Sequence, residues 1–231
     1  MQYTFFDVET ANEDPSSICA IGIVSVKDNQ IKEKKYYLIK PEPLYVDPFY
    51  TTIHSITEEM LIEQPKFNEI WDSIKYLFNN VTLIAHYSPF DMRCLRETLE
   101  YYNIEFPEAS YSCSYAISRR IVKGLPNYKL NTLADHYNIK FKHHNALSDA
   151  ETSFSIISKI MEDNGLSDLE QIHKQFKIRK GYIKSNGEWS GYRSISLNKS
   201  NTIAKNIKAE GDPFDENHIF FNKQIVFTGA L

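Results

Sequence analysis

The first part of the chain alternates apolar runs with polar turns, the pattern of strands in an antiparallel sheet. An aromatic and β-branched run covers residues 3–10, and a second apolar run covers 18–26 after a polar loop. A short turn leads to a third run over 34–39, after which Pro41 and Pro43 stop the sheet. Three strands joined by short connections predict an antiparallel meander.

Farther along the chain, apolar positions recur at helical spacing, and short apolar runs separate these segments. Ser88-Pro89 is typical of a helix start, and Thr57 is a suitable N-cap. Helices are predicted over 58–62, 68–79, 89–102, 115–121, 131–137 and 145–161, and strands over 81–86 and 111–113. A meander followed by alternating helices and strands predicts an α/β fold with a mixed sheet covered by helices.

The composition is that of a globular protein with a core, because 42% of the 231 residues are hydrophobic. The sequence contains no apolar run of membrane length and no basic leader before an apolar block, so we expect a cytoplasmic protein without membrane contact. Cys19, Cys94 and Cys113 form no C-x-x-C pair. They predict reduced, mostly buried thiols and neither a disulfide framework nor a zinc site.

The net charge of −4 hides an uneven distribution. Between His173 and Lys208 there are nine basic residues and one acid, Glu188, with Tyr182, Trp189 and Tyr192 among them. Aromatic and basic side chains together can bind single-stranded nucleic acid. A solvated linker is the alternative interpretation. We therefore predict a domain over 1–165 followed by a basic linker or extension over 166–222.

Two acids interrupt the first strand, where a buried strand would normally carry none. Side chains alternate along a strand, so Asp7 and Glu9 point the same way with Cα atoms about 6.6 Å apart. Two such carboxylates can share a pair of divalent ions, which lie about 3.5–4 Å apart in two-metal sites. An exposed edge strand is the more common explanation of Asp7-Val8-Glu9 taken alone, so the metal interpretation requires further ligands.

Asp91 and Asp149 are the further candidate ligands. Each lies near the start of a predicted helix, where open α/β folds collect ligands at the carboxyl edge of the sheet. The helix dipole alone also favours an acid in a first turn. Together, four acids on one strand and two helix starts indicate hard cations bound by oxygen ligands.

Histidines offer a general base beside these acids. His144 precedes Asp149 by five residues, and its ordinary pKa suits it to accept a proton from an attacking water. The adjacent His143 competes for this role. His86 fits either the site or a core position satisfied by the backbone, and Lys129 fits either a phosphate contact or a solvated surface.

Three segments carry a resemblance to a known family. They are Phe6-Asp7-Val8-Glu9-Thr10, His86-Tyr87-Ser88-Pro89-Phe90-Asp91 and His144-Asn145-Ala146-Leu147-Ser148-Asp149-Ala150. In this order and spacing they resemble the exonuclease motifs of the DEDD family, histidine subgroup, over residues 1–162. That group includes the proofreading subunit of bacterial replicative DNA polymerase. The chain departs from the pattern at Ser55, where the family has glycine, and at Tyr87, where many members have asparagine.

The resemblance implies a ribonuclease H-like fold, a mixed five-stranded sheet flanked by helices. It implies that Asp7, Glu9, Asp91 and Asp149 hold two Mg²⁺ or Mn²⁺ ions and that His144 is the general base. Glu9 and Thr10 would contact the terminal nucleotide. The implied product is a nucleoside 5′-monophosphate released from a DNA 3′ end, in repair, replication or proofreading with a polymerase or repair partner.

Two other functions stay open on the sequence. One is an exoribonuclease that trims RNA 3′ ends, because no reader of the 2′-hydroxyl is identifiable. The other is a catalytically silent adaptor that docks DNA or protein, although an adaptor does not need four acids and a base. Residues 223–231 resemble the first strand of a BRCT domain, which suggests a truncated module at that end.

Overall fold

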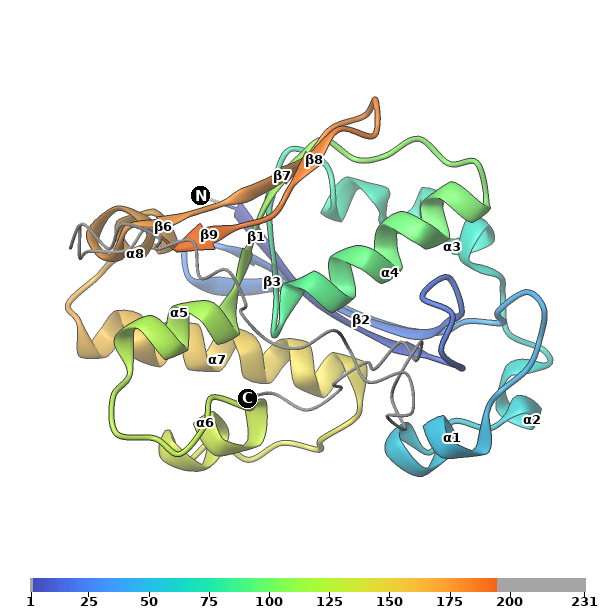
Figure 1. Ribbon diagram of the computed structural model, residues 1–231, viewed down its shortest axis with the longest axis horizontal. Coiled ribbons are helices and arrows are strands. Elements are labelled where there is room, and N and C mark those ends of the chain that lie inside the picture. Colours follow the sequence, from blue (N-terminus) through green and yellow to red (C-terminus); the bar gives the residue numbers. More distant parts are fainter. Residues whose placement is uncertain (1, 195–231) are drawn as a thin grey trace, which may run out of the picture. The chain divides into compact units, whose positions relative to one another are not determined.

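In the described residues, 2–194, helices cover both faces of a mixed β-sheet (Figure 1). The computed structural model describes residues 2–194. The order of the strands is β3-β2-β1-β4-β5-β7-β8. The strands are β1 (Gln2–Thr10), β2 (Ile18–Lys27), β3 (Gln30–Leu38), β4 (Thr82–Ala85), β5 (Ala109–Cys113), β7 (Gly181–Ile183) and β8 (Trp189–Ser190).

The strand directions match the expected topology. β1 pairs antiparallel with β2, which pairs antiparallel with β3, whereas β1, β4 and β5 are parallel. The predicted ribonuclease H-like mixed sheet is therefore confirmed in its first five strands, and β7 and β8 extend it to seven.

Helices follow the strands in the order expected for an α/β fold. They are α1 (Pro48–His54), α2 (Glu58–Leu61), α3 (Phe67–Ile74), the 3₁₀ helix η1 (Lys75–Leu77), α4 (Ser88–Tyr101), α5 (Ser114–Ile121), α6 (Leu130–His136), α7 (Ala146–Asp163) and α8 (Leu169–Phe176). Across residues 2–194, no helix combines the length and the apolarity that crossing a bilayer requires. The thiols of Cys19, Cys94 and Cys113 are free and buried, as predicted.

The two faces of β1 belong to different cores, because its side chains alternate. Phe6 and Val8 pack in a cluster with residues of α3 and α4. Tyr3 and Phe5 pack in a second cluster with residues of α5, α6 and α7. Helix α7 packs against this second face (Figure 1). Asp7 and Glu9 share the face with Tyr3 and Phe5, because side chains alternate along the strand.

Helix α1 was not predicted, because residues 48–54 were interpreted as part of an irregular segment. Asp47 accepts a hydrogen bond from the backbone N–H of Phe49 at 2.8 Å, and Pro48 begins the helix. An acid followed by proline is a regular helix start. Strand β3 also begins earlier than predicted, at Gln30.

The described part of the basic segment, 166–194, is folded. It forms α8 and four short strands, of which β7 pairs with β5 while β6 (Ile178–Arg179) pairs with β9 (Arg193–Ser194). The Arg96 guanidinium of α4 lies 3.8 Å from the centre of the Trp189 ring, which ties β8 to α4. The domain boundaries stay predictions, and the BRCT-like strand at 223–231 lies outside the described residues.

Candidate active site

Asp7 and Glu9 stand near the end of β1, where its pairing changes. β1 pairs with β4 only as far as Phe5 and Ile84, and its ladder with β2 is irregular between Glu9 and Thr10. Such irregularities bend a strand and redirect its side chains, often beside functional sites. Both acids are partly buried, and their strand spacing keeps them on one face.

Asp149 reaches the same place from the first turn of α7. Asn145 caps this helix by accepting a hydrogen bond from the Ser148 N–H at 3.1 Å. The His144 N–H donates to Oδ2 of Asp149 at 3.1 Å, whereas Oδ1 is buried and has no hydrogen-bond partner among residues 2–194. A buried carboxylate oxygen without a partner is costly, so this atom is placed to accept a ligand.

Asp91 approaches β1 from the opposite side, in the first turn of α4. Its Oδ1 accepts a hydrogen bond from the Val8 N–H at 3.2 Å, and its side chain is 2% exposed. The bond fixes α4 to the strand segment between Asp7 and Glu9. The structure thus brings all four predicted acids to one end of the sheet from three elements.

The four carboxyl groups are too buried and too close together to ionise independently. Burial, followed by the charges of Asp91, Glu9 and Asp149, raises the pKa of Asp7 well above its usual range. Burial and the Asp149 charge raise the pKa of Glu9 to about 8. Burial raises the pKa of Asp149 to about 7 against the opposing His144 hydrogen bond, and burial also raises the pKa of Asp91 well above its usual range.

This donor set fits divalent cations. One oxygen each from Asp7, Glu9 and Asp149 lies within 4.8 Å of the other two. Carboxylate oxygens are the ligands of Mg²⁺ and Mn²⁺, and a cation removes the repulsion that otherwise keeps protons on these groups. The unpartnered Oδ1 of Asp149 supports the same conclusion.

His143 and His144 lie at the open side of the carboxylates. Both are exposed, their ring centres are 3.8 Å apart, and one nitrogen of each lies within 4.8 Å of an Asp149 oxygen. Burial lowers the pKa of His144, so its imidazole is neutral near pH 7 and able to accept a proton. The geometry therefore leaves both histidines available as a base.

His86 is a positioning residue and not a free base. Its Nδ1 lies 2.9 Å from the Ser114 hydroxyl and its Nε2 lies 3.0 Å from the Tyr128 carbonyl. Burial lowers the pKa of His86 to about 4. Of the two alternatives left by the sequence, the structure thus shows a histidine satisfied by its neighbours. Lys129 is exposed.

His54 is a residue to which the sequence analysis gave no role. Its Nδ1 accepts a hydrogen bond from the Ile56 N–H at 3.0 Å, so Nε2 carries the proton and donates to the Thr10 carbonyl at 3.1 Å. The Thr10 side chain is only 4% exposed. His54 therefore fixes the end of β1 just beyond Glu9, a contact between segments that no local pattern indicates.

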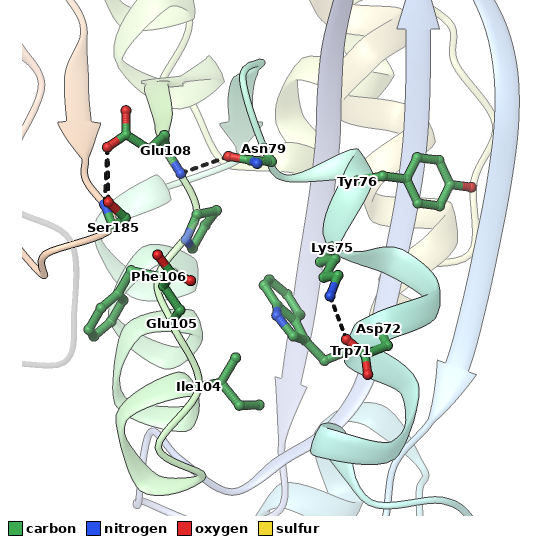
Figure 2. A pocket seen from close by; sticks show the side chains of 11 residues that line it. Trp71, Asp72, Lys75, Tyr76, Asn79, Ile104, Glu105, Phe106, Glu108 and Ser185 are labelled. Atoms are coloured by element: carbon green, nitrogen blue, oxygen red, sulfur yellow. Dashed lines mark hydrogen bonds and ion pairs between the residues drawn. The ribbon is translucent and has the colours of Figure 1, made fainter.

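A pocket elsewhere in the structure does not contain the candidate active site, so pocket volume does not locate the carboxylates. It measures about 620 Å³ and lies between α3 and the connection from α4 to β5 (Figure 2). Glu108 closes it by donating its N–H to Asn79 and accepting from the Ser185 hydroxyl. None of the four clustered carboxylates lines it.

Comparison with known sequences identifies the family. The family model described as Exonuclease, RNase_T, matches residues 4–157. The chain belongs to the Exonuclease family. It is 27% identical over 226 residues to the 3′-5′ exonuclease DinG of Staphylococcus epidermidis, covering 96% of this chain and 24% of that protein. It is 30% identical over 198 residues to the DNA polymerase III subunit epsilon of Buchnera aphidicola, covering 74% and 78%.

A third relative is the PolC-type DNA polymerase III of Caldanaerobacter subterraneus, 25% identical over 189 residues, of which this chain covers 13%. The chain thus spans a quarter or less of the length of the DinG and PolC-type relatives.

Solved structures share the fold at lower identity. Exonuclease X in complex with 5′ overhanging duplex DNA aligns with a TM-score of 0.59 and 23% identity, over 74% of this chain and 98% of that one. Apo exonuclease I aligns with a TM-score of 0.62 and 14% identity, over 76% and 44%. These likenesses confirm the exonuclease fold predicted for the domain.

Proposed function

We propose that the protein is a metal-dependent 3′-to-5′ exonuclease that removes nucleoside 5′-monophosphates from DNA 3′ ends. The observation that carries this proposal is the convergence of Asp7, Glu9, Asp91 and Asp149. Burial raises the pKa of all four, and the charges of neighbouring acids raise the pKa of Asp7, Glu9 and Asp91 further. The membership in the Exonuclease family supports the same reaction class.

The four carboxylates would hold two Mg²⁺ or Mn²⁺ ions. Bound there, the ions would lower the pKa of the attacking water and stabilise the leaving 3′ oxygen. His144 accepts the proton of that water, since its imidazole is neutral near pH 7 and exposed beside Asp149. Glu9 and Thr10 contact the terminal nucleotide, with Thr10 held by His54.

The segment that includes α8 carries positive charge. Lys174, Lys177 and Arg179 are exposed on and after α8, and they would attract the phosphates that the acidic site repels. A single-stranded DNA 3′ end is the proposed substrate, in repair or proofreading, with a polymerase or repair protein as partner. Action in the cytoplasm and a BRCT-like role for residues 223–231 stay predictions.

The decisive assay compares end-labelled DNA and RNA strands of one sequence, with Mg²⁺ or Mn²⁺, and measures released mononucleotides. We expect DNA to be degraded from the 3′ end and Asp7→Ala to abolish release. Faster release from RNA would establish the exoribonuclease alternative. No release from either strand, with Asp7→Ala leaving nucleic-acid binding unchanged, would establish the adaptor alternative.

A further inference from the structure

Tyr87 stands at the carboxyl edge of the sheet, beside the carboxylates. β4 is parallel to β1 and β5, with Phe5 opposite Ile84 and Ala85 opposite Cys113. Tyr87, just beyond the end of β4, is therefore level with the segment of β1 that carries Asp7 and Glu9. Four residues later in the first turn of α4 comes Asp91, so Tyr87 lies on the approach to the site.

Core packing does not explain this tyrosine. Its side chain is 55% exposed, and its backbone is left-handed with φ 71° and ψ 51°. A bulky residue rarely adopts that conformation, which costs free energy and favours glycine or asparagine. Phe90, in the first turn of α4, is also 45% exposed. Two large aromatic side chains thus face solvent at the start of α4, the helix that carries Asp91.

One aromatic ring contacts the Tyr87 ring from the protein side. The Tyr115 ring, two residues beyond the end of β5, meets it edge to face with centres 5.9 Å apart. Tyr115 is in turn contacted by the rings of His86 at 5.8 Å and Tyr128 at 6.4 Å. Since His86 is held by two further contacts, the exposed Tyr87 ring packs against an aromatic cluster that is in place before any ligand arrives.

We propose that Tyr87 stacks on an unpaired base of the nucleic-acid end that enters the site. This inference rests on the proposed nuclease function and adds a contact that binds the substrate strand. Cations held by the carboxylates would attract phosphates but would not bind a base, so a base near the site needs an uncharged contact. An aromatic face provides it for every base, because each base has a flat π surface. Tyr87 is thus a substrate-binding residue for single-stranded ends.

The test uses the full chain and a fluorescent single-stranded DNA oligonucleotide, with Ca²⁺ in place of Mg²⁺ and intact DNA verified afterwards. Tyr87→Asn tolerates the left-handed backbone, whereas Tyr87→Phe keeps the ring. We expect Tyr87→Asn to weaken binding about tenfold and Tyr87→Phe to bind like the parent. Tyr101→Ala removes an exposed tyrosine from the other end of α4 and is the matched control, with unchanged affinity.

A scan of single abasic positions near the 3′ end identifies the stacked base. At one position, base removal should weaken binding by the parent about tenfold but leave the Tyr87→Asn affinity unchanged, because both changes remove the same contact. The stacking proposal is wrong if Tyr87→Asn binds as tightly as the parent. It is also wrong if, at every abasic position, the affinity lost through Tyr87→Asn adds to the affinity lost through base removal. A parent that neither binds nor cleaves the strand instead refutes the proposed function, and thermal melting confirms that the variants are folded.

Discussion

Gly22 of β2 lies directly opposite Asp7 of β1 in the antiparallel ladder. Paired residues point to the same face, so a side chain at position 22 would stand beside the Asp7 carboxylate. A Cβ there would lie 2.2 Å from backbone atoms of Ala146 and Leu147, at the start of α7. Because Gly22 has no side chain, the start of α7 can pack directly on the sheet. This packing places Asp149 close to Asp7.

Gly22→Ala should disrupt the site without touching a ligand. The added methyl must displace the first turn of α7, and overpacking of this kind costs about 1–3 kcal/mol of the free energy of unfolding. Because Asp149 moves with that turn, we expect nuclease activity to fall at least about tenfold. Thermal unfolding and mononucleotide release measure the two effects.

Gly191→Ala is the matched control, because an added Cβ there meets nothing within 4 Å and the backbone is not left-handed. It should leave both measurements unchanged. Parental activity in Gly22→Ala would mean that α7 can shift without moving Asp149 away from Asp7.

Ser55→Gly should stabilise the protein. Ser55 ends α1 in the left-handed conformation, with φ 63° and ψ 16°, where glycine has no steric cost. We expect a gain of about 1 kcal/mol in the free energy of unfolding, measured by denaturant titration. The same change in the middle of α7, Ser158→Gly, should instead cost about 0.5–1 kcal/mol. A loss at both positions would contradict the account.

Much of the fold could be predicted from local patterns. The apolar runs over β1 and β2 and the helical spacing over α4 and α7 were sufficient for a mixed sheet covered by helices. Strand β7 was not predicted, because its place depends on a distant contact: a Cβ on Gly181 would lie 2.6 Å from the Tyr111 ring. Three residues carry no periodicity that would reveal such pairing.

The candidate site could be predicted from the sequence to about the same extent as the fold. The sequence indicated the acids and the histidines, and the resemblance assigned their roles. The hydrogen bond from Val8 to Asp91, the unpartnered Oδ1 of Asp149 and the contact of His54 with Thr10 depend on tertiary packing. No spacing rule places atoms from different elements within bonding distance, so these contacts required the structure.

His144 and His143 can be separated by substitution with asparagine. His144 has a left-handed backbone, with φ 59°, which asparagine tolerates better than alanine. We expect His144→Asn to lower kcat about 100-fold or more while binding of Mn²⁺ stays nearly intact. His143→Asn should retain activity, whereas Asp149→Ala should lose both activity and metal. Equal loss of metal in His144→Asn and Asp149→Ala would make His144 a ligand.

Metal binding should release protons, and its affinity should rise with pH. Without a cation, the folded protein keeps protons on Glu9, with a pKa of about 8, and on Asp149, with a pKa of about 7. An unfolded chain releases them near pH 4–4.5, so these groups lower the stability of the metal-free protein as the pH rises toward 8. A divalent cation takes the place of the protons and reverses that loss.

We therefore expect Mg²⁺ to raise the thermal midpoint more at pH 8.5 than at pH 6. Calorimetric titrations in buffers of different ionisation enthalpy should show proton release at pH 7 that declines by pH 9, where Glu9 and Asp149 are already ionised. Asp149→Ala provides the control, since it should lose the metal and, with it, the proton release. Proton release independent of pH, or a larger stabilisation at pH 6, would show that the carboxylates ionise separately and do not form a shared cation site.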